Sequence, residues 1–373
     1  MMSNKVTVVT ERLYPDENST SYFMTEITHA ISDANGGDIN VICAGGLNGY
    51  DELPFLKNKI IRLANSKLSK NNYFSRIFRV SILAFRLGWH TLFSIKKGDR
   101  LFTHTLEPLV LIIAIIRKFK NFEYILLVYD VFPENLIAAN VLKKESLIYK
   151  VLKFFFDWAY SQTDHLVVIG RDMQELIEKK TEGAIPISLI TNWCDIDKVK
   201  VQLKNENQII KNFNLEHKVV FSFVGNLGRV QGIDFLLKVA SLVKSPDFVL
   251  LFIGDGASVT SINKYIDTSN NKNVIYAGHF PFSENNLVLN ACDVAIVSLN
   301  KSMYGLGVPS KSYNNMAAMK PILYIGDSNS EIGQVVVENN IGWVCDELHA
   351  SEVARRIESV SYTHLTLPTN REV

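Results

Sequence analysis

The chain has 373 residues, which is too long for one typical hydrophobic core and predicts two domains. A hydrophobic content of 47% and a charged content of 21% are typical of a soluble globular protein. The formal net charge of +1 argues against a dedicated nucleic-acid binder. The four cysteines have no CxxC spacing, so we expect reduced thiols, with neither a disulfide framework nor a zinc site.

The first half alternates apolar strands with helical patterns, which predicts a parallel α/β sheet. Strands are expected over residues 5–9, 39–44, 100–105, 124–130, 164–169 and 186–190. Helices are expected over residues 20–32, 73–93, 146–160 and 172–179, with a further helix between the third and fourth strands. The loop after the first strand has no GxGxxG, so a nicotinamide-type dinucleotide fingerprint is absent.

Residues 54–98 contain no Asp or Glu but many Lys and Arg. Within them, the helix expected over 73–93 is apolar nearly all round and is interrupted by Arg76, Arg79 and Arg86. It can be a core helix with solvated arginines, or it can lie on an anionic membrane surface with its aromatic side chains inserted. The acid-free flanks favour the membrane surface and make these arginines candidates for headgroup contacts.

No targeting or membrane-spanning segment is expected. The N-terminus opens directly into a strand and lacks the pattern of a signal peptide. The longest apolar run, residues 109–116, is too short to span a bilayer. We therefore expect a cytoplasmic protein, peripheral to the inner face of the cytoplasmic membrane.

The polar segment 198–217 has few apolar anchors and is expected to connect the two domains. After it the alternation restarts, with strands expected over residues 219–224, 248–253, 273–276, 293–299, 322–325 and 343–344. We predict an N-terminal Rossmann-like domain over 1–197 and a C-terminal one over 198–360, both doubly wound and facing a central cleft. Residues 361–373 have neither helical nor strand periodicity, and we expect a non-native tail there.

Residues 303–325 combine a glycine loop with the start of a helix. Gly305 and Gly307 follow an expected strand, Pro309 and Ser310 are typical of a helix start, and Pro321 ends the helix. Free backbone N–H groups and the positive end of the helix dipole favour an anion at such a place. The cation Lys311 in the first turn fits a dianion such as a diphosphate, although an ordinary turn with a surface lysine has the same pattern.

Several motifs occur together, in order. The second half contains FVGNLGRVQGIDFLLKVA, FIGDGA, YAGHFPFSE, ACDVAIVSL and GLGVPSKSYNNMAAMKPIL, and the first half contains TERLYPDENS, LVYDVFPEN, TDHLVVIGRDM and ITNWCDIDK. This ordered set resembles the retaining GT-B glycosyltransferases of family 4, above all the bacterial members that build O-antigen, capsule or exopolysaccharide. The resemblance covers nearly the whole chain up to about Glu358.

The resemblance implies a UDP-sugar donor and a lipid-linked saccharide acceptor, with no nucleic acid as partner. The positions that match the family's donor-binding elements are Gly225, Asn226, Gly228, Gly307, Val308, Ser310 and Asn314, where Asn314 replaces the glutamate that holds the donor ribose. The usual phosphate-loop Arg and Lys are Asn226 and Gln231 here, so Arg229 and Lys311 must neutralise the leaving group. In the first domain, Asp130 lies in the motif that faces the transferred sugar.

Three residues of the first domain have expected roles. Asp130 can orient the acceptor hydroxyl or stabilise the sugar ring, or it can simply cap the loop after its strand. His104, at a strand end, is an acceptor-side candidate, and Glu134 is expected to be a solvated residue at a helix start.

The chemistry implied is loss of a diphosphate leaving group. Preorganised N–H groups, Lys311 and Arg229 would stabilise the negative charge that grows on the phosphate oxygens. The sequence has no DxD-type carboxylate pair in a suitable place, so we expect neither a metal nor a cofactor, with retention of configuration as the family implies.

Two alternatives remain. A UDP-N-acetylhexosamine 2-epimerase shares the architecture, although the expected cluster of carboxylates and histidines is not evident. An inactive binding subunit of a polysaccharide assembly complex is the other, favoured by the missing phosphate-loop cations.

Overall fold

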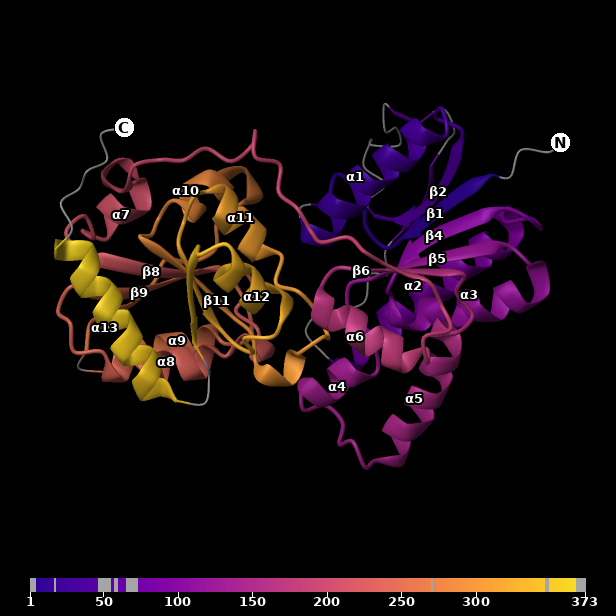
Figure 1. The fold of residues 1–373 in the computed structure, drawn as a ribbon. Helices are drawn as coiled ribbons and strands as arrows, with labels where there is room; N and C mark the ends of the chain where they lie inside the picture. Colours follow the sequence, from indigo (N-terminus) through magenta and orange to yellow (C-terminus); the bar gives the residue numbers. More distant parts are fainter. Residues whose placement is uncertain are drawn as a thin grey trace. The chain divides into compact units, whose positions relative to one another are not determined.

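The computed structural model describes residues 5–16, 18–45, 55–56, 60–64, 73–269, 271–345 and 349–366. For residues 73–77, 229 and 361–366 the description covers the backbone only, so the side chains of Arg76 and Arg229 lie outside it. The chain divides into two units (Figure 1), one of residues 1–191 with the short segment 305–307 and one of 192–304 with 308–373.

The first unit is built on a parallel sheet of seven strands in the order β3-β2-β1-β4-β5-β6-β7. The strands are β1 (Val6–Thr10), β2 (Ile39–Ala44), β3 (Ile61–Leu63), β4 (Arg100–His104), β5 (Glu123–Val128), β6 (His165–Val168) and β7 (Ile187–Leu189). The helices are α1 (Ser19–Ala34), α2 (Tyr73–Ser94), α3 (Glu107–Lys120), α4 (Glu134–Ala138), α5 (Leu147–Tyr160) and α6 (Arg171–Lys180). The strand order reverses at β1 and β4, as in a doubly wound sheet.

Helices cover both faces of this sheet. Because right-handed crossovers run in opposite directions from β1 and from β4, α1 lies on one face and α2, α3 and α5 on the other (Figure 1). On that second face α3 packs against both α2 and α5.

The second unit has a parallel sheet of six strands in the order β10-β9-β8-β11-β12-β13. Its strands are β8 (Val219–Val224), β9 (Phe248–Ile253), β10 (Val274–Tyr276), β11 (Val294–Ser298), β12 (Ile322–Ile325) and β13 (Gly342–Cys345). Its helices are α7 (Gln208–Asn212), α8 (Ile233–Leu242), α9 (Val259–Thr268), α10 (Asn285–Leu289), α11 (Lys311–Ala317), α12 (Glu331–Glu338) and α13 (Ala350–Thr366). One core joins α8, α9 and α13 to the sheet, and separate clusters join α7 and α10, and α11 and α12, to it.

The predicted α/β class with two Rossmann-like, doubly wound domains is confirmed. Strands β2, β8, β9 and β12 have the predicted bounds because each is predominantly apolar, with only Asn40 in β2 and Ser222 in β8 as polar residues, as expected for strands buried on both faces.

One local expectation is wrong. Residues 198–217 are not a bare connection: they belong to the second unit, and Ile209, Ile210 and Leu215 are buried in its core. Residues 361–366, at the start of the expected tail, continue α13, and the non-native origin of the tail stays a prediction. Residues 367–373 lie outside the described residues.

Candidate functional site

In the second unit, the candidate donor elements follow two neighbouring strands. Strands β8 and β11 pair directly, so their carboxyl ends lie at the same edge of the sheet. The Gly225–Gly228 loop follows β8, and a longer loop leads from β11 to α11. Gly225 has φ +114°, and a Cβ on Gly254 would lie 1.9 Å from the carbonyl oxygen of Gly225. The positive φ favours glycine at 225, and the absence of a side chain at Gly254 lets the two loops approach backbone to backbone.

Lys311 is the first residue of α11, and its ammonium group is enclosed. The Nζ atom is buried, and the described residues provide no hydrogen-bond partner for it. It lies 3.5 Å from the centroid of the Phe223 ring, on β8, which offers it a cation–π contact. Burial lowers the pKa of Lys311 to about 7, because desolvation disfavours the charged form. Any anion that reached this ammonium would restore its charge.

Other buried polar atoms near the same strand ends lack partners among the described residues. They are Gln231 Oε1, in the turn after the β8 loop, and Ser298 Oγ, at the end of β11. Unpaired buried polar groups are uncommon in folded proteins and usually point to a function or a bound polar species. This edge of the second sheet is thus polar and incompletely satisfied, as a site for a polar ligand would be.

The remaining donor-side residues differ in their surroundings. Asn226 is exposed, and Val308 packs against the α11 and α12 cluster. Ser310 occupies the N-cap position but makes no side-chain cap hydrogen bond, so the expected capping role is wrong: its backbone is already helical, with φ −59° and ψ −24°. Gly307 belongs to the segment counted with the first unit.

Asn314 is held by a residue that sequence reasoning did not single out. The thiol of Cys194 donates to Asn314 Oδ1 over 2.9 Å. With the oxygen engaged, the Asn314 amide nitrogen remains as the group that can donate to a ligand. The other cysteines, Cys43, Cys292 and Cys345, are buried and free.

In the first unit, Asp130 follows β5 in an exposed position. The described residues donate no hydrogen bond to its carboxylate, while its backbone N–H donates to Thr105 Oγ1 over 3.2 Å. Surrounding protein raises the pKa of Asp130 to about 6 by desolvation, and the negative charge of Glu107 adds to this. Water also reaches this exposed residue, and its screening works against the shift. Asp130 does not cap a helix, since the N-cap of α4 is Pro133.

His104 is fully engaged inside the first unit. Its Nδ1 lies 3.1 Å from the carbonyl of Thr105 and must donate to it, and Nε2 lies 3.1 Å from Thr10 Oγ1. Burial lowers the pKa of His104, so the neutral ring is favoured. Both ring nitrogens therefore have protein partners, which favours a structural role over an acceptor-side one.

Glu134 is not the solvated residue expected from the sequence. Its side chain is mostly buried and pairs with Lys180 and Lys153. Sequence reasoning missed this cluster because its members come from three different helices. Among the described residues no group of three or more His, Cys, Asp or Glu side chains is arranged to hold a metal ion.

The predicted membrane helix is α2, and its arginines differ in their surroundings. Arg79 is half-buried, and Arg86 donates from Nη1 to the carbonyl of Ala64 over 2.6 Å. At least one hydrogen-bond donor of Arg86 is therefore engaged within the protein. None of the helices in the described part of the chain is long and apolar enough to cross a membrane.

Known proteins resemble the chain in both sequence and fold. Residues 204–363 match the family described as glycosyl transferases group 1. The chain is 36% identical over 359 residues to "Probable glycosyltransferase WbjE" of Pseudomonas aeruginosa, a match that covers 95% of this chain and 89% of that protein.

Solved structures with low sequence identity share the fold. HepE of Anabaena, solved in complex with UDP, has a TM-score of 0.68 at 11% identity, covering 96% of this chain and 90% of that one. WaaG, a glycosyltransferase involved in lipopolysaccharide biosynthesis, has a TM-score of 0.64 at 14% identity, covering 96% of this chain and 90% of that one. The chain therefore belongs to the glycosyl transferases group 1 and is a glycosyltransferase of the GT-B fold.

Proposed function

We propose that this glycosyltransferase is a retaining, metal-independent enzyme of family 4. It moves a sugar of the N-acetyl-hexosamine type from a UDP-sugar to a lipid-linked saccharide in cell-surface polysaccharide synthesis. The observation that supports this best is the enclosed ammonium of Lys311, which has no hydrogen-bond partner among the described residues and stands at the start of α11. HepE and WaaG, which share the fold, are described with UDP and with lipopolysaccharide biosynthesis respectively.

The donor diphosphate is the ligand that this edge of the second sheet fits. Lys311 would gain an anionic partner for a charge that burial otherwise disfavours. Backbone N–H groups of the Gly225–Gly228 loop and Arg229 would add donors to the same phosphates, and Asn314 would donate to the ribose. Bond breakage leaves negative charge on the diphosphate, and groups fixed in advance around that charge lower the barrier most.

Asp130 would act on the sugar side. An ionised carboxylate can accept a hydrogen bond from the acceptor hydroxyl, or stabilise positive charge on the sugar ring. Its carboxylate receives no hydrogen bond from the described residues, so it is available for either task.

The enzyme would bind the inner face of the cytoplasmic membrane through the second face of the first unit. Exposed apolar residues form a stripe along α5, at spacings of three and four residues, namely Leu147, Ile148, Val151, Phe154 and Phe155. Neighbouring α3 exposes Ile115 and Phe119, and α2 exposes Phe78, Phe85, Trp89 and Phe93. Exposed lysines such as Lys118, Lys143, Lys144 and Lys150 accompany them, as anionic lipid would require.

The test is a screen of UDP-hexosamines against lipid-linked saccharide acceptors with the purified protein. We expect UDP release that requires an acceptor and survives EDTA, and a product whose anomeric configuration, read by NMR, matches that of the donor. Failure to bind UDP or to release it from any donor would overturn the proposal. Conversion of the UDP-sugar to its 2-epimer without an acceptor would establish the epimerase instead.

A further inference from the structure

Two hydroxyl groups from other elements hold the backbone of Asp130. The N–H groups of Tyr129 and Asp130 both donate to Thr105 Oγ1, over 3.1 and 3.2 Å. On the other side, the hydroxyl of Tyr160, at the end of α5, makes a long hydrogen bond of 3.4 Å to the carbonyl of Asp130. Tyr160 is completely buried, and burial raises its pKa well above the usual value, so the hydroxyl remains a donor.

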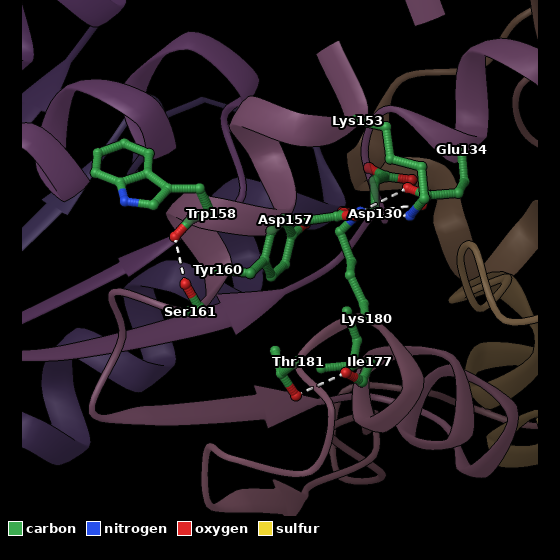
Figure 2. Close-up of polar contacts among 10 residues, drawn as sticks. All are labelled: Asp130, Glu134, Lys153, Asp157, Trp158, Tyr160, Ser161, Ile177, Lys180 and Thr181. Carbon is green, nitrogen blue, oxygen red and sulfur yellow. Dashed lines mark hydrogen bonds and ion pairs between the residues drawn. The ribbon is translucent and has the colours of Figure 1, made fainter. Parts of the chain in front are cut away.

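Close to this contact lies a partly buried group of four charged side chains, with Lys180 at its most buried point (Figure 2). Lys180 comes from the end of α6 and exposes only 1% of its side chain. Its Nζ lies 3.0 Å from both carboxylate oxygens of Glu134, and it also pairs with Asp157. Lys153 bridges the same two carboxylates, at 2.9 Å from each. Three helices, α4, α5 and α6, are tied together at one place.

The group reaches the Asp130 loop from two directions. Glu134 is the first residue of α4, so its ion pairs fix the end of the loop that Asp130 begins. The Nζ of Lys180 also lies 5.2 Å from the centroid of the Tyr160 ring, whose hydroxyl contacts Asp130. The loop from Tyr129 to Glu134 is thus held at its start by Thr105 and Tyr160 and at its end by Lys180.

Stability alone is a poor explanation for such a group. Burying the ammonium of Lys180 costs desolvation energy, and a well-packed apolar residue of similar size often serves stability equally well. Burial by itself would raise the pKa of Glu134, but Lys180 and Lys153 outweigh burial and hold it below the usual value. The Glu134 carboxylate therefore stays ionised. Its ion pairs are directional and fix the relative positions of the groups that form them, whereas apolar contacts are not directional.

We propose that Lys180 is a positioning residue for sugar transfer: through Glu134, Asp157 and Tyr160 it fixes the 129–134 loop, so that Asp130 presents its carboxylate in one direction. The inference rests on the role proposed above for Asp130. Lys180 itself is not a catalytic residue, because its Nζ is enclosed by its protein partners.

The test uses a double variant, Lys180→Met with Asp157→Leu, which leaves the Glu134–Lys153 pair intact and no carboxylate unpaired. Lys179→Met is the matched control, since Lys179 is the exposed neighbour on the same helix. We expect faster amide exchange confined to the 129–134 segment and a fall in kcat of about 10- to 100-fold, because small errors in position cost that much. The KM for the UDP-sugar should stay within about twofold, since the donor elements other than Gly307 belong to the second unit.

Tyr160→Phe, which removes only the hydroxyl, serves if the double variant does not fold, and should raise exchange at residues 129–131 and lower kcat severalfold. Wild-type amide exchange and kcat in the folded variants would overturn the inference, as would faster exchange spread over the whole first unit.

The variant Asp130→Asn distinguishes failure of the role proposed for Asp130 from failure of the positioning role. If it keeps wild-type kcat, the role of Asp130 fails and the positioning role with it. If it loses kcat while the Lys180 variant does not, only the positioning role fails.

Discussion

At the scale of single residues, the features with the clearest chemistry are two ionisable groups whose pKa values are shifted toward neutrality. Lys311 is shifted down to about 7 and Asp130 up to about 6, each mainly by desolvation. Each shift shows that the surrounding protein disfavours the charged form of the group. A bound ligand of opposite charge or with hydrogen-bond donors would stabilise that form. Both give predictions whose sign follows from the direction of the shift.

UDP affinity should fall as pH rises above about 7. Below that pH Lys311 is already protonated, whereas above it the free enzyme must take up a proton to bind the diphosphate. The decrease in UDP affinity approaches tenfold per pH unit. It ends at the pH that equals the higher pKa of Lys311 in the UDP complex. Titration calorimetry between pH 7 and 9 measures it, in a window above the phosphate's own pKa of about 6. In Lys311→Met the pH dependence should vanish; if it persists there, another group binds the proton.

The rate of transfer should rise with pH through about 6 and then level off. Asp130 must be ionised to accept a hydrogen bond or to stabilise positive charge, and its pKa is raised to about 6. The profile of kcat/KM measures this limb, because it reports the pKa values of the free enzyme. Asp130→Asn should lose most of the rate along with the limb. A profile of wild-type shape in that variant would assign the limb to a different acid.

At the scale of elements, buried strands were the most predictable and short polar segments the least. Strand β3, of three residues, went unpredicted because so short an edge strand has no readable periodicity. Helix α5 was predicted as an ordinary helix, yet Leu147 is 76% exposed and Phe119 on neighbouring α3 is 82% exposed. Periodicity locates an apolar stripe, but only the packing of α3 and α5 shows that these stripes face away from the sheet.

The apolar stripe gives the prediction at this scale. Leu147→Ser with Phe154→Ser should lower binding to anionic liposomes by about 100-fold, because each large apolar side chain contributes about tenfold or more when buried. Flotation with vesicles containing an anionic lipid measures it. Ile190→Ser, an exposed apolar residue elsewhere in the first unit, is the control. The triple change of Arg76, Arg79 and Arg86 to Glu should abolish binding. If the stripe variant floats like the wild type, this face does not meet the bilayer.

At the scale of the whole molecule, the sequence predicted both Rossmann-like units and the strand ends that carry the candidate site. It could do so because apolar runs and glycine turns are local signals. The partly buried group around Lys180 could not be predicted, since Lys180 and Glu134 lie 46 residues apart in the sequence. The enclosure of Lys311 against Phe223 was equally invisible, because it depends on which strands become neighbours.

If Lys311 holds the leaving diphosphate, its removal should slow turnover, which is measured in the variant Lys311→Ala. Lys264→Ala, an exposed lysine on α9 of the same unit, is the control. Removing one preorganised group that stabilises the leaving charge costs about 10²- to 10³-fold in kcat. We predict a loss of at least this size in a variant that remains folded, with weakened UDP binding and full activity in the control. Near-normal turnover by Lys311→Ala would show that Lys311 does not hold the diphosphate and that other residues bind the leaving group.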